Sequence, residues 1–256
     1  MRGLQWFNAL SAGAIAVEGL PRSLKVAEGV LGEQPVRYIA VVTDAQNRFP
    51  RARNGEVGLL EGWGLAKAVD EAIARGDTRP ISAIVDVPSQ AYGRREEALG
   101  IHQALAAAAD SYARARLAGH PVIALLVGKA MSGAFLAHGY QANRLIALRD
   151  PGVMVHAMGK ASAARVTLRS VEELEALAAS VPPMAYDIDS YASLGLLWET
   201  LSVSQIEQPT SEDVARVSDC LVSAIKDIGS TDLSGRLGAT NRAASSHVRQ
   251  LLREQW

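Results

Sequence analysis

The 256-residue sequence has little cysteine and almost no net charge. Its one cysteine, Cys220, cannot form an intrachain disulfide, which favours a reducing compartment. Cys220 lies among apolar residues at helical spacing, so we expect a packed thiol rather than a nucleophile. The 26 Lys and Arg against 27 Asp and Glu give a formal net charge of −1. This balance removes the global electrostatic argument for binding nucleic acid or an anionic membrane.

The sequence also lacks a long hydrophobic run. Nothing approaches the ~20 apolar residues that span a bilayer. At the N-terminus, Gln5, Asn8 and Ser11 interrupt the apolar core that a signal peptide needs. The apolar residues there recur at helical spacing, at Leu4, Phe7, Leu10 and Ala14. We therefore expect an amphipathic first helix and a cytoplasmic protein.

Several chemical motifs are absent as well. There is no His-Glu-x-x-His, no pair of cysteines, and no P-loop spacing around Lys129. We expect no metal site and no cofactor bound by this chain itself.

The segments that are present alternate between strands and helices, which predicts an α/β architecture. Expected strands span residues 36–43, 81–87, 122–127, 144–148 and 152–156, and expected helices span 59–74, 94–118, 171–179, 212–228 and 243–254. We expect Ser211 to begin the helix near residue 212 as its cap. The break at 180–186 suggests one domain with a core over about 20–180 and a helical extension over about 181–256.

The most informative stretch is PVIALLVGKAMSGAFLAHG, residues 121–139. It predicts a buried strand, a tight turn at Gly128 and a helix that opens at Ser132 and Gly133. A helix start carries unpaired N–H groups and a partial positive charge, so it attracts a negative oxygen. A second polar loop, 86–93, follows the neighbouring predicted strand. Ligands of α/β sheets collect where such loops meet.

Two motifs in this region resemble a known family. DVPSQAYGRREE and, after the next strand, GKAMSGAFL are similar to the loops in the carboxyl-terminal half of acyl-CoA carboxyltransferases of the crotonase superfamily. The stretches VDVPSQAYGRREE, GKAMSGAFLAHGYQA and PPMAYDID, with WF near the start, resemble the malonate decarboxylase gamma-subunit family more closely.

The resemblance implies a crotonase-like (ClpP/crotonase) fold and an enzyme subunit. It implies an active site shared with a beta subunit, which decarboxylates a malonyl thioester. The malonyl group is carried by an acyl carrier (delta) subunit on a phosphoribosyl-dephospho-CoA arm. An acyl transferase (alpha) subunit then exchanges the acetyl product for fresh malonate.

Site residues follow from the motif positions. Backbone N–H groups of Gly133 and Ala134 are expected to stabilise an enolate oxygen, while Gly128 permits the turn. Ser132 is expected to cap the helix or touch substrate, and Lys129 to attract a carboxylate or phosphate or to be a surface charge. The facing loop supplies the rest of the lining: Ser89, Gln90, Tyr92 and Gly93.

Two departures from the carboxyltransferase pattern narrow the chemistry. Ser89 and Gln90 replace Gly-Ala, which fills space where the larger enzymes receive carboxybiotin and favours release of CO2. Met158 stands where a crotonase hydratase has glutamate, and a thioether cannot act as acid or base. Hydration is therefore not expected.

Other interpretations remain open. Ser132 is a nucleophile if a histidine, His138 or His156, lies within hydrogen-bond reach, as a hydrolase or peptidase requires. The chain is otherwise a scaffold for a catalytic beta subunit. Arg48, Arg51 and Arg53 either dock an acidic carrier or are merely solvated. The sequence leaves open the proton donor to the enolate, the division of catalysis, the copy number and a biotin-linked pathway.

Overall fold

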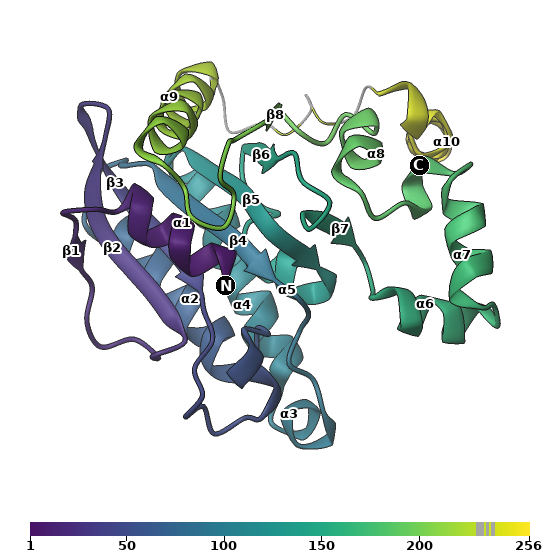
Figure 1. Ribbon diagram of the computed structural model, residues 1–256, viewed down its shortest axis with the longest axis horizontal. Helices are drawn as coiled ribbons and strands as arrows, with labels where there is room; N and C mark the ends of the chain where they lie inside the picture. The colour runs from purple at the N-terminus through teal and green to yellow at the C-terminus, as the bar shows by residue number, and fades with distance from the viewer. Residues whose placement is uncertain (229–232, 234–235, 237–238) are drawn as a thin grey trace.

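The computed structural model describes residues 1–228, 233, 236 and 239–256, and it is built on one mixed β-sheet (Figure 1). The strand order is β1-β2-β3-β4-β5-β6-β8, and β7 pairs with the end of β5. The first two pairings are antiparallel, and those from β3 onward are parallel. The strands are β1 (Ile15–Ala16), β2 (Leu24–Leu31), β3 (Gln34–Val41), β4 (Ile81–Val87), β5 (Val122–Met131), β6 (Arg144–Leu148), β7 (Met154–His156) and β8 (Glu199–Leu201).

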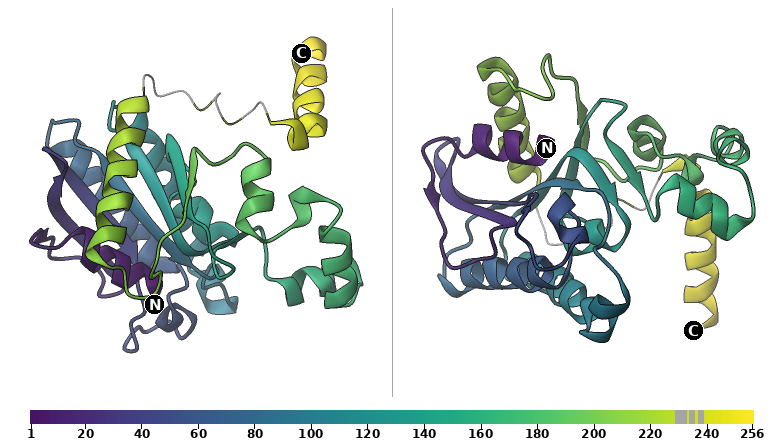
Figure 2. Two further views of the ribbon diagram at one scale, coloured as in Figure 1. Left: turned by 45° about the horizontal axis from the view of Figure 1, so that its top comes forward. Right: turned by 60° about the horizontal axis from the view of Figure 1, so that its bottom comes forward.

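Helices cover both faces of this sheet. On one face lie α2 and α4, and on the other lie α1 and α9 (Figures 1 and 2). The helices are α1 (Arg2–Leu10), α2 (Leu59–Ala74), α3 (Arg94–Ala98), α4 (Ile101–Leu117), α5 (Ser132–Ala137), α6 (Lys160–Thr167), α7 (Val171–Ala178), α8 (Ile188–Ser193), α9 (Ser211–Asp227) and α10 (Ala243–Gln255). Short 3-10 turns span Arg51–Asn54, Pro182–Met184 and Thr240–Arg242.

The core lies on the central parallel strands. Residues of β4 and β5 from Ile81 to Val85 and from Val122 to Val127 are buried throughout, because helices pack on both of their faces. Both stretches are almost entirely apolar, as strands covered on two sides require, and Ser82 is the one polar side chain in them. The carboxyl ends of these two paired strands therefore lie side by side on a rigid platform.

A group of helices lies beside the sheet rather than on it. The chain leaves β7, forms α6, α7 and α8, and ends in α10 near them (Figures 1 and 2). A small apolar cluster of Ala163, Ala164 and Leu174 joins α6 to α7. This side group forms one wall of the space next to the end of β5.

The structure confirms most of the helices and strands that were predicted from the sequence. The amphipathic first helix, the strands over 81–87 and 144–148 and the helix over 59–74 form as predicted. In α1 the residues Trp6, Phe7 and Leu10 are buried against the sheet. Cys220 packs against the main core, and burial raises the pKa of its thiol to about 11, so the expectation of a packed thiol is confirmed.

The predicted turn at Gly128 is wrong. Strand β5 continues through Gly128 to Met131. A glycine is needed there because Asp86 lies against it. An ideal Cβ on Gly128 would lie 2.5 Å from Asp86 Cγ and 3.1 Å from its Cβ. The Asp86 carboxylate accepts hydrogen bonds from the backbone N–H of Gly3 (3.0 Å) and of Lys129 (3.1 Å). The glycine thus makes room for a side chain that joins α1 to the end of β5.

Two further expectations are corrected. The single helix over 94–118 is two helices, separated at Gly100, which has a φ of 82° that disfavours other residues. The cap of α9 is Thr210 rather than Ser211, and the Thr210 side chain accepts a hydrogen bond from the Asp213 N–H. Strands β1, β2 and β8 and helices α6 and α8 lie outside the segments that were predicted from the sequence.

The division into a core and an extension stays a prediction, and part of the proposed extension lies outside the described residues. In the described part, α9 and β8 both belong to the main body, since Val217, Leu221 and Ala224 of α9 are buried in the main core and β8 joins the sheet. No helix in the described part is long and apolar enough to cross a bilayer.

Candidate functional site

The two loops that follow β4 and β5 meet at one edge of the sheet, as predicted. Backbone hydrogen bonds fix the loop after β4: the Val57 N–H donates to the Ser89 carbonyl (3.0 Å), and the Ala91 N–H donates to the Val57 carbonyl (2.8 Å). These bonds hold the residue between them, Gln90, in a defined backbone position. Its side chain reaches from this loop toward α5.

The central contact of the site joins Gln90 to Gly133. The backbone N–H of Gly133 donates to Gln90 Oε1 over 2.6 Å. A Cβ on Gly133 would lie 2.5 Å from that oxygen, so the approach requires glycine. The Gly133 N–H, the predicted oxyanion donor, therefore faces the space between the two loops. The Gln90 side-chain oxygen lies at the position where this donor would hold an oxyanion.

A cavity of about 410 Å³, here called the loop cavity, opens around this contact. It brings together four predicted site residues, Ser89, Gln90, Tyr92 and Ser132. The full lining is Arg51, Pro88, Ser89, Gln90, Tyr92, Ser132, Ala157, Met158, Gly159, Ser162 and Val166. Met158, which replaces the hydratase glutamate, thus lines the cavity with a group that cannot exchange protons.

Ser132 lies at the point where β5 becomes α5. It has a φ of 58°, a left-handed conformation that is strained for a residue with a Cβ. The residue at the cap position is Met131, and no side-chain hydrogen bond caps the helix. The prediction that Ser132 caps α5 is therefore wrong, whereas its contact with substrate stays a prediction.

A second, more apolar cavity of about 350 Å³ adjoins the first, because Ser132 and Ala157 line both. We call it the apolar cavity. Its lining is Ser132, Gly133, Phe135, Leu136, Tyr140, Val155, His156, Ala157, Pro183, Ala185, Tyr191, Leu194 and Leu196. His156 is its one histidine among the described residues.

The structure separates the two histidines considered as partners of Ser132. His138 is fully buried, and its ring nitrogens contact the Tyr112 hydroxyl (3.0 Å) and the Ile84 carbonyl (3.0 Å). Burial lowers the pKa of His138 to about 4, so it is a neutral core residue. In the described part of the chain no hydrogen bond joins Ser132 to His138 or to His156.

Five predicted residues do not line the loop cavity, and one of them, Gly133, lines the apolar cavity instead. Lys129 is exposed on β5, where its N–H bonds to Asp86, and Ala134 is fully buried in α5. Gly93 precedes α3 in extended backbone, and Gly128 makes room for Asp86. The turn assigned to Gly128 does not form, and the other assigned roles stay predictions.

Of the three loop arginines, only Arg51 lines the cavity. Its guanidinium lies 4.7 Å from the centre of the Tyr92 ring and donates to Glu56 (2.5 and 2.9 Å). Hydrogen bonding to Glu56 raises the pKa of Arg51. Arg48 stacks on Phe49 and Arg53 bonds to the Asn47 carbonyl. The sequence could not show which of the three arginines faces the site, because all three lie in one short polar loop whose path depends on the rest of the fold.

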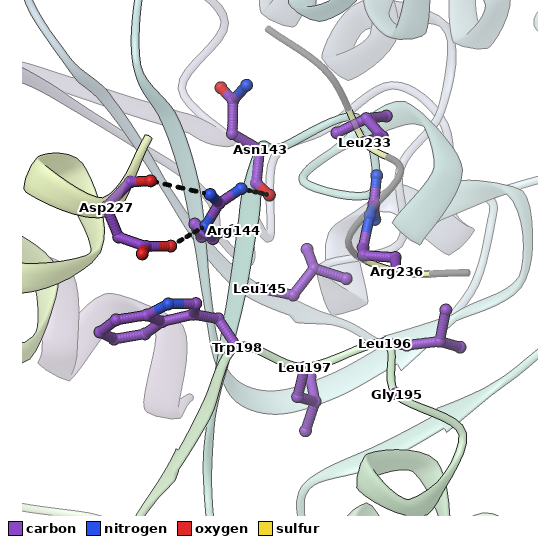
Figure 3. Close-up of a pocket in the computed structure, with 10 residues that line it drawn as sticks. All are labelled: Asn143, Arg144, Leu145, Gly195, Leu196, Leu197, Trp198, Asp227, Leu233 and Arg236. Atoms are coloured by element: carbon purple, nitrogen blue, oxygen red, sulfur yellow. Dashed lines mark hydrogen bonds and ion pairs between the residues drawn. The ribbon is translucent and has the colours of Figure 1, made fainter. Parts of the chain in front are cut away.

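A third cavity lies at the N-terminal end of β6, where Asn143, Arg144 and Leu145 line it (Figure 3). It contains none of the predicted site residues. Arg144, at its edge, is already bonded to Asp227 (2.7 Å). Among the described residues, no three His, Cys, Asp or Glu side chains gather where they could hold a metal ion.

Comparisons with known proteins agree on one family. The family model described as malonate decarboxylase gamma subunit matches residues 52–256. A curated relative, the malonyl-S-ACP:biotin-protein carboxyltransferase MADD of Malonomonas rubra, is 34% identical over 230 residues, which cover 86% of this chain and 75% of the relative.

Solved structures show the fold over the whole chain. A chain in the Pseudomonas malonate decarboxylase hetero-tetramer in complex with coenzyme A is 71% identical with a TM-score of 0.96, covering 100% of this chain and 99% of that one. A chain of the Pseudomonas MdcD-MdcE hetero-dimer is 67% identical with a TM-score of 0.92 and the same coverage. Transcarboxylase 12S is 20% identical with a TM-score of 0.66, covering 87% of this chain and 41% of its own, which shows the fold alone. The predicted crotonase-like carboxyltransferase fold is thereby confirmed.

Proposed function

The chain belongs to the family of malonate decarboxylase gamma subunits, and from this membership we propose that it forms, with a beta subunit, the site that decarboxylates a malonyl thioester. The pairing is proposed because a similar chain is part of the Pseudomonas MdcD-MdcE hetero-dimer. The product is the acetyl thioester, and CO2 leaves without an acceptor.

The Gly133 N–H is the observation that carries this proposal. Breaking the carbon–carbon bond to the carboxylate leaves an enolate, whose charge lies largely on the thioester oxygen. A preorganised N–H directed at that oxygen stabilises the charge as it develops, by roughly 2.7–4 kcal/mol for one donor. The Gly133 N–H already donates to an oxygen in the loop cavity, that of Gln90.

Gln90 Oε1 marks the position of the enolate oxygen. It is a carbonyl oxygen 2.6 Å from the donor, slightly closer than the roughly 2.7–3.1 Å expected of an oxyanion. Substrate binding therefore requires the Gln90 side chain to turn away. Only the side chain has to move. The backbone of the loop stays in place, because the Ser89 carbonyl and the Ala91 N–H are both hydrogen-bonded to Val57.

The same side chain supports release of CO2 rather than its transfer to biotin. Ser89 and Gln90 add polar bulk to the loop that faces α5, and Gln90 extends across to Gly133. The Malonomonas relative is named a biotin-protein carboxyltransferase, whereas the structures at 71% and 67% identity are malonate decarboxylases. We propose that this chain acts in the direct, biotin-independent reaction.

The remaining components follow from the family. We propose that the malonyl group arrives on a phosphoribosyl-dephospho-CoA arm of an acyl carrier (delta) subunit, and that an acyl transferase (alpha) subunit reloads it. This chain itself supplies no cofactor. Docking of the carrier on Arg48, Arg51 and Arg53 stays a prediction, supported by the position of Arg51 at the cavity.

One experiment tests the proposal. The chain is purified with and without the beta subunit, and formation of acetyl thioester from a malonyl thioester is followed. We expect activity only from the pair. Activity from this chain alone would exclude a shared site, and carboxylation of added biotin by the pair would exclude direct release. Full activity of the pair with Gly133→Pro, which has no N–H to donate, would reduce this chain to a scaffold.

A further inference from the structure

Decarboxylation ends with a proton transfer that the oxyanion donor cannot perform. Once CO2 has left, the enolate carbon must receive a proton to become the methyl group of the acetyl thioester. The described titratable residues that line the two cavities are Arg51, Tyr92, Tyr140, His156 and Tyr191. Imidazole is the only one of these groups whose ordinary pKa lies near neutral pH.

Strand pairing places His156 beside the oxyanion donor. In the parallel pair of β5 and β7, His156 lies opposite Met131, the residue before Ser132. Its half-buried ring lines the apolar cavity together with Ser132 and Gly133. Gln90 approaches this strand end from the β4 side and His156 from the β7 side. A thioester whose oxygen is held by Gly133 therefore lies between the two.

The ring of His156 is held in one orientation. It stacks on Tyr186 with ring centres 3.9 Å apart and an interplanar angle of 13°. Its Nδ1 accepts a hydrogen bond from the Met158 N–H (3.2 Å) and also lies 2.9 Å from the Met158 carbonyl oxygen. The Tyr186 hydroxyl donates to the same carbonyl (2.9 Å), which fixes the stack from the other side. Within the described residues, Nε2 has no hydrogen-bond partner.

We propose that His156 is the general acid that protonates the enolate carbon, an inference that rests on the decarboxylase function proposed above. The bond between the malonyl carboxylate and its α-carbon breaks, CO2 leaves, and the bonding electron pair forms the enolate. The imidazolium then gives its Nε2 proton to the α-carbon, and the enolate electrons form the new C–H bond. The neutral ring regains a proton from water.

The contact at Nδ1 suits this role. In the neutral ring Nδ1 accepts from the Met158 N–H, so the ring proton is on Nε2. In the protonated ring Nδ1–H donates to the Met158 carbonyl instead, and Nε2–H is again the free donor. This makes Met158, which cannot itself exchange a proton, the residue whose backbone orients the acid.

The surroundings of the His156 ring set the direction in which its pKa shifts. Burial lowers the pKa of His156, and the contact with the Met158 backbone opposes this effect. Nearby charged and titratable groups are largely engaged: Lys160 lies 5.5 Å from the centre of the Tyr186 ring and pairs with Glu175, while Asp187 accepts from the Ser190 N–H. Tyr186 and Tyr191 have raised pKa values because of burial and stay neutral. Turnover should therefore fall as pH rises through a value below 6.5.

The test uses the beta–gamma pair and a malonyl thioester of coenzyme A. In His156→Gln the side-chain amide replaces Nε2 with a group that cannot donate as an acid. We expect kcat to fall at least about 100-fold, as for loss of a general acid, with KM unchanged. The pH dependence of kcat should disappear in the same variant. The matched control is His102→Gln, because His102 is an exposed histidine of α4 that lines neither cavity.

A second measurement separates proton donation from structural support. In His156→Ala, added imidazole should restore part of the rate in proportion to the imidazolium concentration, which a merely structural residue would not show. Wild-type kcat in His156→Gln, or loss of activity as a raised KM with no imidazole effect, would overturn the proposal. If the wild-type pair does not decarboxylate the thioester, the proposed function fails instead.

Discussion

The substitution Gly128→Ala tests whether a side chain 42 residues away, rather than a turn, requires the glycine. The added methyl would lie 2.5 Å from Asp86 Cγ, well inside van der Waals contact. Gly128 does not have a positive φ, so the backbone itself tolerates alanine. The Asp86 carboxylate must therefore move, and it loses its bonds to the N–H groups of Gly3 and Lys129.

The magnitude follows from those two bonds. A hydrogen bond to a charged group contributes about 1.5–3 kcal/mol. The Asp86 side chain is partly exposed, so we take the lower value for each bond and expect Gly128→Ala to lower the free energy of unfolding by roughly 3 kcal/mol. Asp86→Ala removes the same bonds and should cost a similar amount.

The assay is urea unfolding of the wild type, both single variants and the double variant. Once Asp86 is alanine, the space beside residue 128 is open. Adding Gly128→Ala should then change the free energy of unfolding by less than about 0.5 kcal/mol. The double variant should thus be as stable as Asp86→Ala alone. Additive costs in the double variant would refute the reasoning and restore an intrinsic backbone requirement for glycine.

Three further predictions concern the site and its support. Gln90→Ala removes the oxygen that competes with substrate for the Gly133 N–H. KM for the malonyl thioester should therefore fall about two- to tenfold at constant kcat, which is the equivalent of one net hydrogen bond. A raised KM would show instead that Gln90 binds substrate. Ser132→Ala should lower steady-state turnover by no more than about tenfold, the equivalent of one lost hydrogen bond to substrate, and a loss of several orders of magnitude would revive the nucleophile interpretation. The pKa of His138 falls from 6.5 to about 4 on folding, so its contribution to stability is complete above pH 6.5 and is lost as pH decreases toward 4, by up to about 1.4 kcal/mol per pH unit. In urea titrations between pH 7 and 4.5, His138→Phe should lack that part of the slope, and an unchanged slope would contradict the assignment.

The central strands and helices could be predicted because their patterns are local. The apolar runs of β4 and β5 and the amphipathic spacing of α1 identify those elements without reference to the rest of the chain. Strand β2 was missed because Lys25 and Glu28 interrupt its apolar pattern, and Glu28 is there to pair with Arg37 and Arg79. That reason becomes visible only once the strands are paired.

The site shows the same limit. The motifs correctly indicated which two loops meet and placed Ser89, Gln90, Tyr92 and Ser132 on one cavity. They could not show that Gln90 bonds to Gly133, because that contact depends on a side-chain rotamer across 43 residues of sequence. Nor could they show the stack of His156 on Tyr186, which requires β7 to lie beside β5.

The contacts of α1 join segments that are far apart in the sequence. Arg2 pairs with Asp150 (2.7 Å) and Glu207 (2.5 Å), and the Trp6 indole donates to the Ile206 carbonyl (2.9 Å). The same helix buries Trp6 and Phe7 in the main core and places the Gly3 N–H on Asp86. Its partners therefore lie 83 to 205 residues further along the chain. Non-local contacts of this kind slow folding, because the entropy of closing a long loop is lost before the contact forms.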